Sequence, residues 1–188
     1  MATHIALLRG INVGGKNKVP MADLRTMVAE LGTAGVSTYI QSGNVLFTAP
    51  GDADCQALGS AIAAAVAAKL GVTSAVVVIT RDELAEINAA NPFPDEPEPK
   101  RVHAVILTKP PSAELAAKLD EAAAKAAAKG DPASSVTVGR TIYLHTPAGY
   151  GDSDLAAATL RIVSSPKAGL TGTARNRATM TKLLELCG

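Results

Sequence analysis

The stretch NPFPDEPEPK, residues 91–100, divides the sequence into two parts that repeat one predicted order of secondary structure. Four prolines and three acidic residues lie within these ten positions. Proline restricts the backbone and acidic side chains favour water, so the stretch is typical of a stiff, solvated linker. We therefore predict a first half over residues 1–90, the linker over 91–100 and a second half over 101–188.

The first half is predicted to run strand, helix, strand, strand, helix, strand, and to end in a further helix. Apolar residues recur at helical spacing after Pro20, and again after Asp52 or Asp54, either of which suits an N-cap. Thr80 and Glu83 have the spacing of a capping box that opens the last helix. The predicted strands cover residues 3–9, 37–41, 44–49 and 75–79.

The second half repeats this order. Helices are expected after Ser112, after Asp152 or Ser153, and after Asn176. The predicted strands cover residues 102–108, 136–138, 141–145 and 170–175. The predicted fold class is therefore α+β, with two ferredoxin-like βαββαβ halves that each carry an extra helix. One continuous α+β sheet built from the same elements is the alternative.

Composition predicts a cytoplasmic protein with an aliphatic core. The 188 residues are 47% hydrophobic but only 3% aromatic, and the formal net charge is +1. So small a charge gives no general attraction for nucleic acid or for a membrane surface. Cys55 and Cys187 lack the spacing of a metal site or a disulfide framework, so we expect no metal and no cofactor. We also find no signal-peptide pattern and no apolar stretch long enough to span a membrane.

The segment GINVGGKN, residues 10–17, comes close to the pattern of a phosphate-binding P-loop. Asn17 stands where that pattern requires a serine or threonine that binds magnesium. The following helix is predicted to start only near Pro20, so its N-terminus is displaced from the glycines. The sequence therefore argues against a P-loop NTPase, while the loop remains a candidate for binding an anion.

A second polar turn is expected beside this loop. A crossover helix makes the first two strands parallel, which brings the glycine-rich loop and the turn QSGN, residues 41–44, to the same end of the sheet. Glycine amides and positive side chains there would hold an anion, and the polar side chains would orient it. The alternative is an ordinary solvated turn. The predicted ligand-binding residues are Arg9, Asn12, Gly14, Gly15, Lys16, Asn17, Lys18, Gln41, Ser42, Gly43 and Asn44.

The C-terminal region is basic. Residues 155–184 contain no acidic side chain but include Arg161, Lys167, Arg175, Arg177 and Lys182. We predict Arg175 and Asn176 as a second anion contact, because a strand there becomes a helix whose N-terminus adds partial positive charge. A solvated face with a helix N-cap is the alternative. The three histidines, His4, His103 and His145, are expected to be ordinary strand residues, and the sequence assigns no catalytic residue.

Four stretches closely resemble a bacterial family known as domain of unknown function 1697 (DUF1697). They are ALLRGINVGGKNKVPMADLR (6–25), TYIQSGNVLF (38–47), NPFP (91–94) and TARNRATMTKLLEL (173–186). The resemblance implies a two-part α+β fold and carries no established activity. The family signature contains every candidate ligand residue named above except Lys18. It also contains Gly10, Pro20, Asn91 and Pro92. The chain departs from the family at Arg177, where a tryptophan is usual.

Three functions stay open at this point. The leading hypothesis is binding of an anionic or phosphorylated small molecule at the glycine-rich loop, with no reaction assigned and enzymatic activity undecided. Nucleic-acid binding is an alternative because plaits of this type often carry RNA on the sheet, but Tyr39, Phe47 and Tyr143 are the only strand aromatics available for stacking. The third is a protein-interaction module with the alanine-rich helices as contact faces. The sequence does not indicate the oligomeric state.

Overall fold

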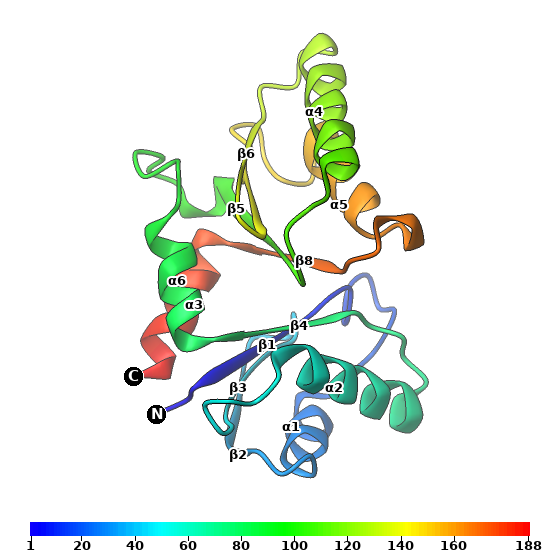
Figure 1. Cartoon of the computed structure of the whole chain (residues 1–188), viewed down its shortest axis with the longest axis vertical. Coiled ribbons are helices and arrows are strands. Elements are labelled where there is room, and N and C mark those ends of the chain that lie inside the picture. The colour runs from blue at the N-terminus through cyan, green and yellow to red at the C-terminus, as the bar shows by residue number, and fades with distance from the viewer. The chain divides into compact units, whose positions relative to one another are not determined.

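The computed structural model describes residues 1–188, which divide into two compact units. Unit 1 comprises Met1–Glu86 and Lys182–Gly188, and unit 2 comprises Ile87–Thr181. Each unit contains one four-stranded antiparallel sheet (Figure 1). This division differs from the one predicted from the sequence, because the proline-rich stretch falls within unit 2 and the C-terminal residues fall within unit 1.

In unit 1 the strand order is β2-β3-β1-β4, and all neighbouring strands are antiparallel. Since β1 and β2 both run antiparallel to β3, they run parallel to one another, as the crossover through α1 requires. The elements are β1 (His4–Leu8), α1 (Met21–Ala29), β2 (Ala34–Tyr39), β3 (Asn44–Thr48), α2 (Cys55–Leu70), β4 (Val76–Thr80) and α3 (Arg81–Ala89), the last of which continues into unit 2.

The core of unit 1 lies between its sheet and the helices α1 and α2. Alternate strand residues face this core, because side chains along a strand point to opposite faces in turn. From the strands come Ala6, Leu8, Val45, Phe47, Val76 and Val78, and from the helices Leu24, Met27, Val28, Ile62 and Val66. Asp54 caps α2 by accepting hydrogen bonds from Gln56 N at 2.8 Å and Ala57 N at 3.2 Å.

Unit 2 repeats the architecture with strand order β6-β7-β5-β8, again antiparallel throughout. Ser112 and Ser153 cap α4 and α5, and these two helices cover the apolar face of the sheet. The elements are two short 3-10 helices (Pro99–Arg101 and Pro166–Ala168), β5 (Val102–Leu107), α4 (Ala113–Ala128), β6 (Ser134–Val138), β7 (Thr141–His145), α5 (Asp154–Val163), β8 (Gly172–Asn176) and α6 (Arg177–Cys187), the last of which continues into unit 1.

The predicted α+β class with two similar halves is confirmed, and the alternative of one continuous sheet is wrong because the strands form two separate sheets. The predicted capping box is also present: Glu83 N donates to Thr80 Oγ1 at 3.1 Å, and Thr80 N donates to Glu83 Oε2 at 2.9 Å. The limits of β2 were predicted wrongly. The strand ends at Tyr39 because Ile40 adopts a positive φ of 49°.

None of the helices combines the length and the apolar composition that crossing a membrane requires. No group of three or more histidine, cysteine, aspartate or glutamate side chains is arranged to hold a metal ion. Cys55 and Cys187 are both free thiols, and burial raises the pKa of Cys187.

Asp131 joins the end of α4 to the start of α5. Its carboxylate accepts hydrogen bonds from Ala133 N, Ser153 Oγ and Leu155 N, each at 2.9 Å. Burial by itself raises the pKa of Asp131, but these donors together hold the pKa below its ordinary value. A charged acceptor shared by three donors is among the stronger local contacts in the unit.

We expect Asp131→Ala to lower the free energy of unfolding by about 1–3 kcal/mol at neutral pH, because three donors lose a charged acceptor. The folded-state pKa lies below the unfolded value of about 3.9, so this stabilisation is present above that value and is lost as the pH falls through the folded pKa. Urea unfolding should therefore show a difference between wild type and variant that shrinks in acid. The exposed Asp120→Ala is the control, and a difference independent of pH would contradict the assignment.

Candidate functional site

The glycine-rich segment after β1 folds into a small hairpin. Lys16 N donates to Val13 O at 3.1 Å, and Asn12 N donates to Asn17 O at 3.0 Å. Gly14 and Gly15 occupy the two central positions with φ angles of 57° and 74°, which is the conformation of a type I′ turn. The segment, hereafter the glycine hairpin (residues 12–17), is therefore not a P-loop, and α1 begins only at Met21.

Asn12 fixes the glycine hairpin to the rest of unit 1. Its Nδ2 donates to Val19 O and to Gln41 O, both at 2.9 Å, and its Oδ1 accepts from Val19 N at 2.9 Å. The bond to Gln41 O joins the hairpin to the segment of residues 40–43 between β2 and β3, hereafter the β2–β3 turn. The two segments that the parallel-strand argument expected at one end of the sheet are thus in direct contact.

Gly43 brings the β2–β3 turn close to the end of β1. Leu8 N donates to Gly43 O at 2.8 Å. A Cβ at this glycine would lie 2.7 Å from Ile11 Cδ1 and 2.8 Å from Leu8 Cβ, and its φ is 81°. Asn44 Nδ2 donates to Tyr39 O at 3.0 Å and to Ser42 Oγ at 3.1 Å, which closes the turn.

Backbone strain gathers where these two segments meet. Three non-glycine residues in the chain have positive φ, namely Asn12 at 54°, Asn17 at 50° and Ile40 at 49°. Asparagine tolerates this region, but a β-branched residue such as isoleucine is a genuine outlier there. All three belong to the glycine hairpin or the β2–β3 turn, so the strained positions of the whole chain share one location.

The candidate residues differ in how much of their side chain is available to a ligand. Lys16 and Lys18 are exposed, and neither ammonium group forms a hydrogen bond or an ion pair. Gln41 is also exposed, whereas Arg9 is half-buried. Asn17 Nδ2, by contrast, donates to Gly10 O at 3.0 Å and so serves the hairpin itself.

The basic residues of the C-terminal region do not form one patch within unit 2. Arg175 is only 8% exposed, and its Nη1 donates to Thr173 Oγ1 at 3.0 Å and to Ala174 O at 2.8 Å. Burial lowers its pKa to about 10. Asn176 Oδ1 accepts from Thr179 N at 2.8 Å, which caps the start of α6.

Arg177 holds the proline-rich segment that was expected to be a solvated linker. Its Nη1 donates to Phe93 O at 3.2 Å and to Pro94 O at 3.3 Å, and its Nη2 donates to Glu96 O. A guanidinium group carries several donors in a fixed plane, which suits it to bind a row of carbonyl oxygens. Arg177, the residue that departs from the family pattern, thus binds the backbone of residues 93–96 through its guanidinium group.

The proline-rich segment also contains a contact between Glu96 and His145 that the sequence did not predict. His145 Nε2 lies 2.6 Å from Glu96 Oε2, and the Glu96 side chain is only 10% exposed. A hydrogen bond from Glu98 N, followed by the bond to His145, lowers the pKa of Glu96. Phe93 packs on the imidazole at a ring distance of 5.2 Å. These groups and the neighbouring prolines line a shallow cavity of about 330 Å³. A strand-end histidine and an acidic segment were visible in the sequence, but their pairing was not.

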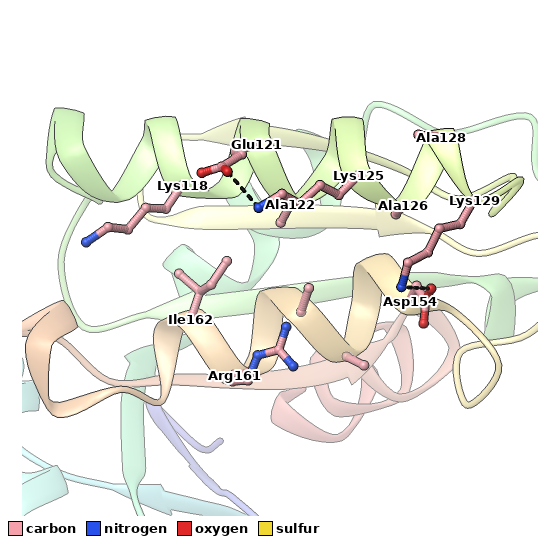
Figure 2. Close-up of a pocket in the computed structure, with 12 residues that line it drawn as sticks. Lys118, Glu121, Ala122, Lys125, Ala126, Ala128, Lys129, Asp154, Arg161 and Ile162 are labelled. Atoms are coloured by element: carbon pink, nitrogen blue, oxygen red, sulfur yellow. Dashed lines mark hydrogen bonds and ion pairs between the residues drawn. The ribbon is translucent and has the colours of Figure 1, made fainter.

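A larger hollow of about 530 Å³ lies between α4 and α5, with alanines between charged side chains (Figure 2). Lys125 forms an ion pair with Glu121 at 2.6 Å, and Lys129 forms one with Asp154 at 3.0 Å. Arg161, on α5, also lines the hollow and has no ionic partner. Because exposed ion pairs already offset most of the charge, this hollow offers an anion little attraction.

Comparison with known proteins identifies the family. Residues 1–135 match the family described as protein of unknown function, DUF1697. The chain belongs to this family. The matched residues of the DUF1697 chain include the glycine hairpin and the β2–β3 turn, whereas Arg175, Asn176 and Arg177 lie beyond them.

One solved structure similar to this DUF1697 chain is that of a conserved bacterial protein from Streptococcus pneumoniae. The TM-score is 0.65 at 23% sequence identity, and the match covers 100% of this chain and 99% of the other. At this identity the likeness concerns the fold alone. No curated protein matches the chain.

We expect Gly43→Ala to lower the free energy of unfolding by about 3 kcal/mol or more, because a positive φ and a steric overlap act together. Gly14→Ala is the matched control: its φ is also positive, but open space surrounds it, so the expected loss is about 1 kcal/mol. Urea unfolding of the two variants measures the difference. Equal losses would mean that the close approach to Leu8 and Ile11 is not tight.

Proposed function

We propose that this protein binds an anionic or phosphorylated small molecule where the glycine hairpin meets the β2–β3 turn. The observation that carries the proposal is the gathering of Asn12, Asn17 and Ile40, all with positive φ, at this one place. A non-glycine residue held in this region costs about 1–3 kcal/mol, with asparagine the best tolerated, and such residues cluster at functional sites.

Comparison of the two units gives independent support, because the fold itself does not require the glycine hairpin. The equivalent connection in unit 2, residues 108–112, leads directly from β5 to the cap of α4. Likewise, β6 and β7 are joined only by Gly139 and Arg140, with no strained non-glycine residue. The same arrangement of strands and helices thus occurs twice, and only unit 1 has the glycine hairpin and the strained β2–β3 turn.

The chemistry at this place favours an anion. Lys16 and Lys18 supply two positive charges that no carboxylate offsets, and the amides of Gly14 and Gly15 lie at the tip of the hairpin. Successive backbone amides in a turn can form a small concave donor site for phosphate or carboxylate oxygens. Ligand contacts are therefore assigned to Lys16, Lys18, the two glycine amides and the exposed Gln41.

The remaining candidates have a different role in this proposal. Asn12, Asn17, Gly43 and Asn44 shape the site through hydrogen bonds and close packing, and so position the groups that touch the ligand. Arg9 directly follows β1, and Ser42 belongs to the β2–β3 turn, but neither is assigned a ligand contact. The bonds of Arg175 and Asn176 within unit 2 favour a structural role, so the proposal rests on unit 1. No group is placed as a general base, and the proposal is one of binding without a reaction.

The strand order β2-β3-β1-β4, with βαββαβ connections, also supports our proposal that each unit is ferredoxin-like. Such sheets often bind RNA by stacking bases on aromatic side chains. Phe47 is fully buried and Tyr143 is 2% exposed, so neither is available for stacking. Of the three strand aromatics only Tyr39 is partly exposed, and a single stacking residue gives little support to the alternative of nucleic-acid binding.

We expect the wild-type protein to show a raised unfolding temperature with at least one of inorganic pyrophosphate, ATP and a set of sugar phosphates. Saturation at about a hundred times the dissociation constant stabilises a fold by about 2.7 kcal/mol. Lys16→Ala combined with Lys18→Ala should remove this shift and leave the unfolding temperature without ligand unchanged.

Lys100→Ala, an exposed site in unit 2, serves as the charge control and should keep the shift. Absence of a shift with every compound would overturn the proposal, and so would an undiminished shift in the double variant.

We expect Ile40→Asn to raise the free energy of unfolding by about 1 kcal/mol, because asparagine tolerates a positive φ and the Ile40 side chain is 50% exposed. Ile40→Val, which keeps the β-branch, is the control and should give no gain. Urea unfolding decides between them. If asparagine brought no advantage over valine, the strain argument at this position would be incorrect.

A further inference from the structure

The free edge of β6 differs from the equivalent edge of unit 1. Strand β6 pairs with β7 along five consecutive residues and has no strand on its other side. Strand β2 is interrupted by a register shift between Ala34 and Ser37, with Gly35 at a φ of 60°. It also packs against α1, where Arg25 Nη1 donates to Thr38 Oγ1 at 2.9 Å. The β2 edge is thus irregular and partly covered, whereas β6 is regular and contacts chiefly β7.

The residues of β6 do not protect its edge. Natural edge strands carry charges, prolines or bulges, because a regular edge with unpaired backbone groups invites another strand. The sequence of β6 is SSVTV, which has none of these features. Val136 and Val138 point to the same face, because they are two residues apart, and they are 40% and 42% exposed.

We propose that β6 pairs antiparallel with β6 of a second copy of this chain, around a two-fold axis near Val136. Such pairing extends the sheet of unit 2 across the axis into one eight-stranded sheet. A two-fold interface brings the same surface of both copies together, so it must be complementary to itself. An axis at Val136 places Ser134 opposite Val138 of the partner subunit, and Val136 opposite the partner's Val136.

The chemistry of the strand selects a second copy as the occupant. Like charges placed opposite one another destabilise a sheet, and a strand that pairs with itself repeats each of its charges across the axis. Strand β6 has no charge to repeat, and the chain as a whole has a net charge of only +1. Val136 would also lie beside Val136 of the partner subunit, and Val138 beside the partner's Ser134, on one face of the extended sheet. Contact through five residues per chain is small, so the dimer is expected to depend on concentration.

Light scattering after size-exclusion chromatography tests the proposal across a concentration series of the full chain. Wild-type mass should rise from monomer to dimer with concentration. Val136→Lys should weaken this association about tenfold or more, because two ammonium groups then face one another across the axis. Val138→Lys is the second variant, and circular dichroism confirms that each variant is folded.

Ser37→Lys places the same charge on the exposed edge of β2 and should leave the dimer intact. A wild-type protein that stays monomeric throughout overturns the proposal. A dimer that survives both β6 substitutions overturns it as well, and so does one that Ser37→Lys weakens equally.

Discussion

The local structure around the end of β1 in unit 1 depends on Gly43, a position where no side chain fits. At Gly43 the backbone approaches Leu8 and Ile11 so closely that even a methyl group would overlap them. This approach brings the β2–β3 turn against the end of β1, where Gly43 O accepts from Leu8 N. The glycine hairpin that continues from β1 is therefore held beside the turn, and Asn12 adds a hydrogen bond between them. The candidate site depends on this contact, which holds the two segments side by side.

The two units show which features belong to the fold and which were added to it. Both bury an aliphatic core between a four-stranded sheet and two helices, and both open helices with aspartate or serine caps. Only unit 1 has a hairpin after its first strand and left-handed non-glycine residues. Because stability alone selects against strained residues, their confinement to one copy of a duplicated scaffold argues that something other than folding keeps them there.

Sequence patterns predicted the parts of the structure that depend on local rules. Alternating apolar residues gave the strands, and Asp54, Ser112 and Ser153 were all among the expected caps. The end of β2 was missed because no propensity scale places isoleucine at positive φ. The contact between Glu96 and His145 was missed because 49 residues separate them, and such a pair forms only through tertiary packing. Local chemistry therefore predicted which two segments meet at this end of the sheet, but not which side chains hold them together.

This distinction changes how the DUF1697 signature is understood. Three asparagines of the signature, Asn12, Asn17 and Asn44, donate their side-chain hydrogens to main-chain oxygens around the hairpin and the turn. Their amides are thus occupied in holding the loop, so in the function we propose charge would be the main means of attracting a ligand. A preorganised hairpin loses little conformational entropy when it binds. If our proposal is correct, the two exposed lysines on this rigid support would bind an anion with fewer contacts than a flexible loop would need.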